Sequence, residues 1–219
     1  MLADSPVLRW KTDMSSAQRS ARTLTVAVTG ASGLIFVKYL LDALDRDHRV
    51  RRINLIFSDS GLRVMAEELG ISGRSELASR LLGRESAKIE PQNNADIGAN
   101  VASGSYPTDA MIVLPCSMGT LARIANGMAD HLIERAADVC LKQQWPLILC
   151  VRETPFNRIH LRNMSLAAEA GATIFPIIPA FYFLPSTTEA IAREYVNRVL
   201  AHIGLPQPDA YHWKLDEAE

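Results

Sequence analysis

Short apolar runs alternate with amphipathic stretches along most of the chain, beginning at Leu24. Several of these runs are almost continuously apolar, which is typical of strands that are buried on both faces of a sheet. The predicted strands are Leu24–Thr29, Ile53–Ser58, Ala110–Leu114, Leu147–Val151 and Thr173–Ile177. A polar stretch, Glu85–Ile97, is predicted to be a loop within the domain.

The stretches between the runs carry apolar residues at the spacing of amphipathic helices. Within residues 118–132 these residues recur at steps of three and four, which predicts a stripe that faces the core. The stripe consists of Met118, Leu121, Ala125, Met128 and Leu132. The predicted helices are Leu34–Leu44, Gly61–Leu69, Ser75–Leu82, Met118–Met128, Ile133–Gln143, Arg158–Ala170 and Thr188–Ile203.

Strands separated by helices predict right-handed crossovers, and therefore a parallel sheet with helices on both faces. The predicted fold class is α/β, a doubly wound parallel sheet in three layers, α/β/α. We divide the chain into a flexible N-terminal extension (1–23), a single domain (24–204) and a C-terminal tail (205–219) that packs on a neighbouring subunit. In an open parallel sheet the binding crevice lies at the carboxyl ends of the strands, so the loops that follow the strands carry the candidate chemistry.

The composition narrows the choice of partners. The 219 residues include 23 Lys+Arg and 24 Asp+Glu without a basic cluster, which gives no reason to expect nucleic acid. No apolar run reaches the ~18 residues of a membrane span, and the first ~20 residues lack the apolar core of a secretory signal, so we predict a cytoplasmic protein without a membrane partner. Cys116, Cys140 and Cys150 are predicted to be buried thiols, and no metal site is predicted because no histidine has metal-ligand spacing.

The loop after the first predicted strand is rich in small residues, with the sequence Thr29-Gly-Ala-Ser-Gly33. Small side chains let backbone N–H groups approach a phosphate at a helix N-terminus, and Ser32 adds a hydroxyl donor. An ordinary glycine turn with a serine cap would have the same sequence. The motif alone is therefore suggestive and unspecific.

Two further strand-to-helix turns carry hydroxyl groups. Ser58 follows the second predicted strand and alone indicates a plain N-cap. The third strand leads into Pro115-Cys-Ser-Met-Gly-Thr120. Two small, hydroxyl-rich turns in one sheet fit a phosphorylated cofactor held across the crevice.

Charged residues follow the next strand and also lie on the preceding helix. Arg152 and Glu153 stand where the sheet opens to solvent, and they could instead form a local salt bridge. Arg135 and Lys142 are seven residues apart, about 20° from eclipsed on a helix, and could grip one anion. Pairing of Arg135 with Asp138 at i,i+3 is the competing interpretation.

The last predicted strand leads into an apolar loop that ends in a phenol, Pro176 to Tyr182, and then into a helix that carries Arg198. A tyrosine ring lining an apolar pocket can present its hydroxyl to a phosphate. The alternative is that Phe181, Tyr182 and Phe183 belong to the core or to a subunit interface.

Taken together, these segments resemble the UbiX family of flavin prenyltransferases in their order and spacing. They are Thr29–Gly33, Leu114–Leu121, Glu134–Val139 with Leu141 and Lys142, Val151–Pro155, His160–Met164 and Pro179–Tyr182. The resemblance runs from about Leu24 to Trp213.

The resemblance implies a flavodoxin-like fold and a homo-oligomer, a dodecamer built from trimers with active sites between subunits. It implies a metal-independent reaction in which dimethylallyl phosphate alkylates reduced FMN at N5 and then at C6. The product, prenylated FMN, serves UbiD-type decarboxylases, including those of ubiquinone synthesis and aromatic acid decarboxylation.

The resemblance also implies roles for individual residues. The implied FMN contacts are Gly30, Ala31, Ser32, Ser58, Ser117, Met118, Gly119, Thr120 and Arg152. The implied contacts to the prenyl phosphate are Tyr182, Arg198, Arg135 and Lys142, with Trp213 closing over the site. The implied catalytic set is Glu153, Arg135, Lys142, Ser32 and Glu68.

Other classes of protein share parts of this pattern. An FMN-dependent cysteine or phosphopantothenoylcysteine decarboxylase has the early glycine-serine turn but depends on a histidine and an Asn-rich segment that are missing at matching places here. A short-chain dehydrogenase is disfavoured because Tyr39, Tyr182 and Tyr195 are not followed four residues later by lysine. A non-catalytic FMN-binding partner subunit stays open, because Phe36 and Val37 replace the family's tyrosine and glycine on the helix facing the flavin phosphate.

Overall fold

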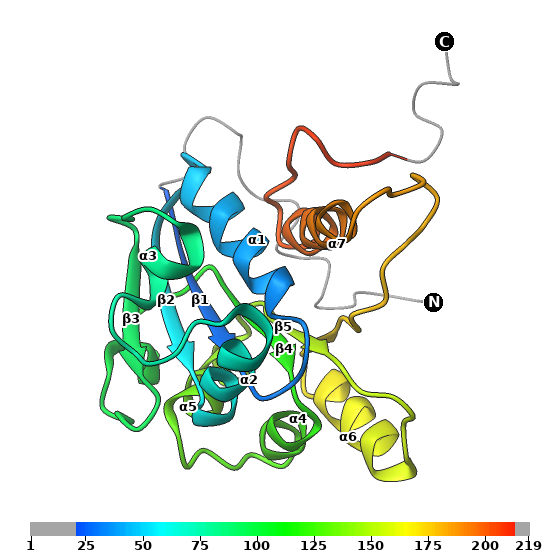
Figure 1. Cartoon of the computed structure of the whole chain (residues 1–219). Coiled ribbons are helices and arrows are strands. Elements are labelled where there is room, and N and C mark those ends of the chain that lie inside the picture. Colours follow the sequence, from blue (N-terminus) through cyan, green and yellow to red (C-terminus); the bar gives the residue numbers. More distant parts are fainter. Residues whose placement is uncertain (1–20, 213–219) are drawn as a thin grey trace, which may run out of the picture.

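A single parallel sheet organises the chain in the computed structural model, which describes residues 21–212 (Figure 1). The strands lie in the order β3-β2-β1-β4-β5-β6, and every neighbouring pair is parallel. They are β1 (Arg22–Val28), β2 (Val50–Phe57), β3 (Ile89–Asn93), β4 (Ala110–Cys116), β5 (Leu147–Val151) and β6 (Thr173–Ile174). The predicted doubly wound α/β fold is confirmed.

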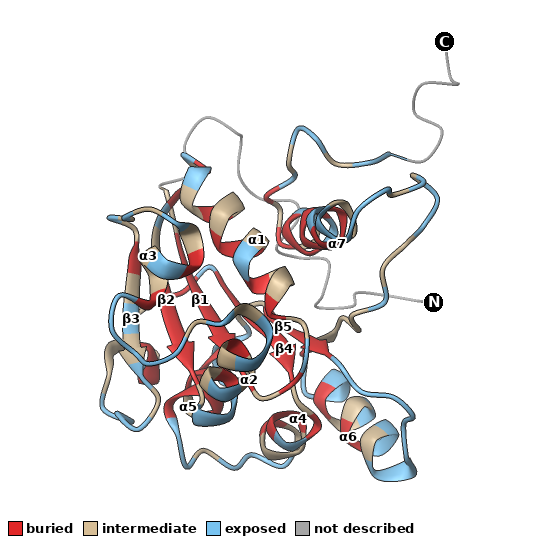
Figure 2. Cartoon of the chain, viewed as in Figure 1, coloured by how far each residue is buried: buried red, intermediate tan, exposed pale blue. Residues whose placement is uncertain are grey.

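Helices cover both faces of the sheet and give the three predicted layers. One face packs against α1, α2, α3 and α7, and the other against α4, α5 and α6. Their bounds are α1 (Leu34–Arg46), α2 (Asp59–Leu69), α3 (Leu77–Leu82), α4 (Met118–Ala125), α5 (Leu132–Gln143), α6 (Arg158–Glu169) and α7 (Thr188–His202), with a short 3-10 helix, η2 (Asn100–Ala102). Figure 2 shows the buried sheet between the two helix layers.

The central strands β1, β4 and β5 are buried along almost their whole length, which explains their continuous apolar sequences. In β1, Leu24, Val26 and Val28 enter the core on one face, whereas Ala27 enters the core on the other face. Every residue of β4 and β5 is buried as well. Both sides of these strands are therefore covered by helices, as the sequence pattern predicts.

The stretch Glu85–Ile97 is not entirely a loop, and this prediction was wrong. Ile89–Asn93 form the edge strand β3, which pairs only with β2. Only Ile89 is buried, the residues after it alternate between half-buried and exposed, and Pro91 cannot donate a ladder hydrogen bond. An edge strand needs little apolar sequence, so the apolar signal was too weak to reveal it.

The predicted stripe on residues 118–132 is broken. Helix α4 ends at Ala125, and Gly127 adopts a positive φ of 68° that continues the chain in a new direction. Met128 is consequently 48% exposed, while Leu132 is buried at the start of α5. The five residues have a helical spacing in the sequence, but they extend over two different helices and do not form one stripe.

The three cysteines and the two residues that depart from the family's sequence pack within the domain. Cys116, Cys140 and Cys150 are buried free thiols, as predicted, and burial raises the pKa of both Cys140 and Cys150 to about 12. Val37 is fully buried in the core, and the Phe36 ring meets Tyr195 of α7 edge to face at 5.0 Å. Both residues that depart from the family's sequence therefore pack within the domain.

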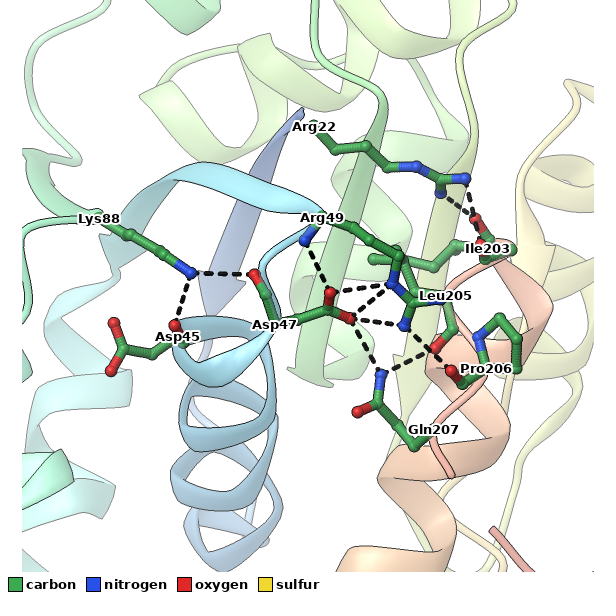
Figure 3. A network of polar contacts seen from close by, with 10 residues as sticks. Arg22, Asp45, Asp47, Arg49, Lys88, Ile203, Leu205, Pro206 and Gln207 are labelled. Carbon is green, nitrogen blue, oxygen red and sulfur yellow. Dashed lines mark hydrogen bonds and ion pairs between the residues drawn. The ribbon is translucent and has the colours of Figure 1, made fainter. Parts of the chain in front are cut away.

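A network of polar contacts joins the first strand to the end of the chain at the amino edge of the sheet (Figure 3). The Arg22 guanidinium donates to the carbonyl oxygens of Ile203 (2.5 Å) and Gly204 (3.1 Å), just beyond α7. The Arg49 guanidinium donates to Asp47 at 2.6 Å and to the Pro206 carbonyl at 3.0 Å. The residues after α7 are thereby tied to β1 and to the turn that precedes β2.

The beginning of the predicted tail thus packs on its own chain, where Leu205 is fully buried. Strand β1 begins at Arg22, two residues before the predicted start of the domain. Contact between the rest of the tail and a neighbouring subunit stays a prediction, because residues 213–219 lie outside the described part of the chain, as do residues 1–20 of the predicted extension.

The Asp47 carboxylate should make the stability of the fold depend on pH. Burial alone would raise its pKa, but hydrogen bonds from Arg49 and Gln207 outweigh burial and lower the pKa from 3.8 to about 2. A lowered folded-state pKa contributes stability above about pH 4 that is lost as the pH falls toward 2, an effect of about 2 kcal/mol. We expect Asp47→Asn to reduce the free energy of unfolding by about this amount at pH 7 in urea titrations. The difference between wild type and variant should shrink below pH 4, and a constant difference would contradict the assignment.

Candidate active site

The loops after β1 and β4 are joined directly at the carboxyl edge of the sheet. The buried Thr29 hydroxyl donates to the Pro115 carbonyl at 2.8 Å and accepts from the Ser117 backbone N–H, also at 2.8 Å. These bonds hold the two glycine- and hydroxyl-containing turns side by side. The predicted contacts Gly30 to Ser32 and Ser117 to Thr120 therefore lie at one place.

The loop after β2 closes on the same turn. The Ser58 N–H donates to the Val28 carbonyl at 3.0 Å, and the Ser58 and Ser60 hydroxyls are 3.1 Å apart. A Cβ atom at Gly30 would come within 2.5 Å of the Ser60 side chain, so only glycine allows this approach. Three loops thus present hydroxyl and N–H groups to a common edge, which is the donor set that a phosphate requires.

Two of the predicted cofactor serines also cap helices. The Ser58 hydroxyl accepts from the Gly61 N–H at 3.0 Å, and the Ser117 hydroxyl accepts from the Thr120 N–H at 3.3 Å. The Ser117 hydroxyl also lies 3.1 Å from the Thr120 hydroxyl. Each serine can both cap a helix and face the crevice, because each of these helices begins at the carboxyl edge of the sheet.

Glu68 reaches the first loop from helix α2. Its carboxylate accepts from the Gly33 N–H (3.1 Å) and from the Leu34 N–H (2.8 Å) at the N-terminus of α1. A carboxylate is favoured there by the helix dipole and by the unpaired N–H groups. The structure therefore brings Glu68 to the loop that contains Ser32.

Arg152 and Glu153 lie beside the β4 turn. The Arg152 N–H donates to the Cys116 carbonyl at 3.2 Å, so the strand end of β5 is fixed next to Ser117. Both side chains are exposed, and the Glu153 carboxylate accepts from the Thr154 N–H at 2.9 Å. Among the ion pairs of the described residues there is none between Arg152 and Glu153, so the alternative of a local salt bridge was wrong.

The two cations of α5 lie in the first and last turns of the helix, so they do not come together at this edge within one chain. Arg135 lies in the first turn of the helix and donates to Asp138 at 2.8 Å, as the competing interpretation expected. Lys142 lies in the last turn, about 10 Å further along the axis, where the chain turns back to enter β5. The helix therefore directs Lys142 to the amino edge, opposite the loops.

The remaining predicted substrate residues lie on the C-terminal third of the chain. Tyr182 is on a loop that leaves β6 and arcs outward beside α7, drawn in orange in Figure 1, and its side chain is 70% exposed. Arg198 is exposed on α7. Trp213 lies outside the described residues.

Two further residues of the site are not among the predicted ones. Thr29 stands in the glycine motif, and its hydroxyl joins the β1 and β4 loops. Ser60 belongs to a Ser-Asp-Ser sequence whose spacing places its hydroxyl on the same turn as that of Ser58, which is the signal that could have identified it. In the described range, no group of three His, Cys, Asp or Glu side chains could hold a metal ion, and no helix is long and apolar enough to cross a membrane.

Comparison with protein families defines the class. The sequence model of the Flavoprotein family matches residues 12–200, which is most of the chain. The chain is therefore a flavoprotein by family, which agrees with the donor-lined edge of the sheet.

Individual relatives define the family more narrowly. The flavin prenyltransferase UbiX of Salmonella typhimurium is 42% identical over 187 residues, 85% of this chain and 94% of the relative. The crystal structure of AnUbiX (PadA1) in complex with FMN and dimethylallyl pyrophosphate has a TM-score of 0.79 and 38% identity over 88% of this chain and 97% of that chain. A dodecameric FMN-dependent UbiX-like decarboxylase from Escherichia coli O157:H7 has a TM-score of 0.79 and 39% identity over 87% of this chain and 98% of that one. The chain belongs to the UbiX family of flavin prenyltransferases.

The Glu68 contact can be tested on the protein alone. Glu68→Ala leaves two N–H groups at the start of α1 without their acceptor, so we expect the free energy of unfolding to fall by about 1 kcal/mol. Glu67→Ala is the matched control on the same helix, since Glu67 pairs only at the surface with Arg63, a pair worth about 0.3 to 0.5 kcal/mol. Urea titration measures both. Equal losses would show that the carboxylate of Glu68 does not stabilise α1.

Proposed function

We propose that this chain transfers the dimethylallyl group of dimethylallyl phosphate to reduced FMN and thereby makes prenylated FMN. The observation that carries the proposal is the convergence of three donor-lined loops at one edge, in a chain whose family is that of the UbiX flavin prenyltransferases. When bound, reduced FMN supplies the nucleophile that accepts the prenyl group.

The residues at the carboxyl edge fit FMN. Hydroxyl and N–H groups of the first two loops, around Ser32 and Ser58, suit the phosphate of FMN. The turn from Ser117 to Thr120 and the guanidinium of Arg152 would hold the remainder of the cofactor. The close approach between Gly30 and Ser60 keeps these groups within reach of one molecule.

The phosphate of the prenyl donor is a second anion at the site, in addition to the phosphate of FMN, and it needs cations of its own. Tyr182 and Arg198 would bind it from the C-terminal third of the chain. Because Lys142 lies at the opposite edge from the loops of its own subunit, we place Lys142 and Arg135 in the site of a neighbouring subunit. Binding there would require Arg135 to release or share its pair with Asp138.

The charges suit the departure of a phosphate group. Cleavage of an allylic carbon–oxygen bond places growing negative charge on the leaving oxygens, and fixed guanidinium and ammonium groups stabilise that charge. The carboxylate of Glu153, beside Arg152, is positioned to move a proton at the crevice, and the carboxylate of Glu68 holds the loop of Ser32.

The assembly and the acceptor complete the proposal. The dodecameric relative supports a homo-oligomer, and we propose a dodecamer built from trimers with the sites between subunits. We propose a UbiD-type decarboxylase as the acceptor of prenylated FMN, and the cytoplasm as the location. The resemblance stated above supports the acceptor.

Turnover with purified protein tests the function. Reduced FMN and dimethylallyl phosphate, mixed without oxygen, should yield a flavin heavier by one prenyl unit in mass spectrometry, and this flavin should activate an apo UbiD-type decarboxylase. Arg198→Ala should lower turnover by at least about 100-fold while FMN binding changes by less than about threefold. Unmodified FMN with both the monophosphate and the diphosphate donor would remove the enzymatic function and favour a non-catalytic FMN-binding subunit.

The placement of Lys142 in a neighbour's site can be tested with mixed oligomers. Lys142→Ala and Arg152→Ala should each be nearly inactive alone. Co-assembled subunits carrying one change each should regain up to about a quarter of wild-type turnover, because some sites then receive both residues intact from different subunits. Oligomers that stay inactive after confirmed mixing would show that Lys142 and Arg152 act within one chain.

A further inference from the structure

The residues after α7 run back along that helix. We call residues 205–211 the strap. The Asn197 side-chain amide donates to Asp209 at 3.5 Å, and the Tyr211 N–H donates to Glu194 at 3.1 Å. Since later strap residues meet earlier helix residues, the strap is antiparallel to α7, as the red segment of Figure 1 shows.

Beyond Leu205, which is fully buried in the core, no residue of the strap is buried. Pro206 to Asp209 form one wall of a groove of about 720 Å³, and α1 and α7 form the others. A segment that borders an open groove takes its position from separate polar contacts rather than from close packing. Those contacts are concentrated at the two ends of the strap.

At its near end the strap is fixed by the network of Figure 3. Gln207 donates to the Leu205 carbonyl at 2.9 Å and to Asp47 at 3.3 Å, and Arg49 donates to the Pro206 carbonyl. These bonds set where the strap starts, on the amino-edge side of the domain.

At its far end the strap is fixed by Glu194. This residue is only 8% exposed, so its carboxylate is costly to bury unless it accepts hydrogen bonds. A bond from a backbone N–H to a carboxylate is stronger than one to a neutral acceptor. Glu194 therefore sets where the strap ends.

The end of the strap touches the loop that carries Tyr182. The Tyr211 ring lies 6.1 Å from the Phe183 ring, centroid to centroid, at an angle of 40°. The neighbouring residues Phe181, Tyr182 and Leu184 are 62%, 70% and 87% exposed. The contact between Phe183 and Tyr211 therefore joins this largely exposed loop to the strap.

We propose that Glu194 is a positioning residue for the prenyl donor. It holds the Tyr211 N–H, Tyr211 packs against Phe183, and Phe183 fixes the adjacent Tyr182 where the donor phosphate binds. This inference rests on the proposed function only in assigning Tyr182 to the donor. The hydrogen bond and the ring contact are independent of that assignment.

Three variants test separately the hydrogen bond between Glu194 and the Tyr211 N–H and the ring contact between Tyr211 and Phe183. Glu194→Ala removes the acceptor, whereas Glu194→Gln keeps a neutral oxygen for the Tyr211 N–H. Tyr211→Leu keeps the N–H and removes the ring. Arg46→Ala is the matched control, because Arg46 lines the same groove but pairs with Asp42, away from the strap.

Hydrogen–deuterium exchange of the peptide containing residues 205–212 measures the strap directly, and steady-state kinetics with dimethylallyl phosphate measure its effect. For Glu194→Ala we expect exchange faster by about tenfold and a KM for the donor about tenfold higher, with kcat and FMN affinity within about threefold of wild type. Glu194→Gln should restore most of both values. Tyr211→Leu should raise the KM for the donor while the exchange of the N–H at position 211 stays slow. Arg46→Ala should change neither the KM for the donor nor the exchange of the strap.

The outcomes distinguish the proposals from one another. Faster exchange with an unchanged KM would overturn the positioning role of Glu194, as would equal losses of kcat and FMN affinity in the Ala and Gln variants. If Glu194→Ala does not fold, the KM of Tyr211→Leu decides in the same way. If wild-type protein makes no prenylated flavin, the proposed function fails, while the exchange data still show whether Glu194 holds the strap.

Discussion

The reversal of strand order between β1 and β4 is the constraint on which the site depends. Strands added after β1 extend the sheet in one direction through β2 and β3, and those added after β4 extend it in the other. The loops that leave β1 and β4 therefore diverge to opposite faces and open a crevice between them. The buried Thr29 hydroxyl spans that crevice at its base, so the fold and the position of the donor groups are fixed by the same contacts.

Much of this arrangement could be predicted from the sequence because it is local or follows from topology. Strand β5 has the predicted bounds, since a buried strand must be continuously apolar. The turns at Ser58 and Ser117 could be placed at one edge without coordinates, because parallel strands bring their carboxyl ends together. Their hydroxyl groups could likewise be recognised as candidate donors.

What could not be predicted depends on contacts between distant segments. Lys142 is nearly eclipsed with Arg135 on the helix, but the direction of α5 between two parallel strands carries it to the far edge of the sheet. Glu68 gains its place only when α2 packs beside α1. Met128 matched a helical stripe that Gly127 interrupts, and the edge strand β3 had too little apolar sequence to be distinguished from a loop.

The bonds from Arg22 to the Ile203 and Gly204 carbonyls join residues 181 and 182 positions apart. Strand β1 is central in the sheet, yet its first side chain donates to carbonyls of residues 203 and 204, beyond the end of α7. Contacts of such separation form late, because loop closure must precede them. During synthesis these two bonds cannot form until residues 203 and 204 have left the ribosome, so the amino end of β1 is tied down only after α7 has been made.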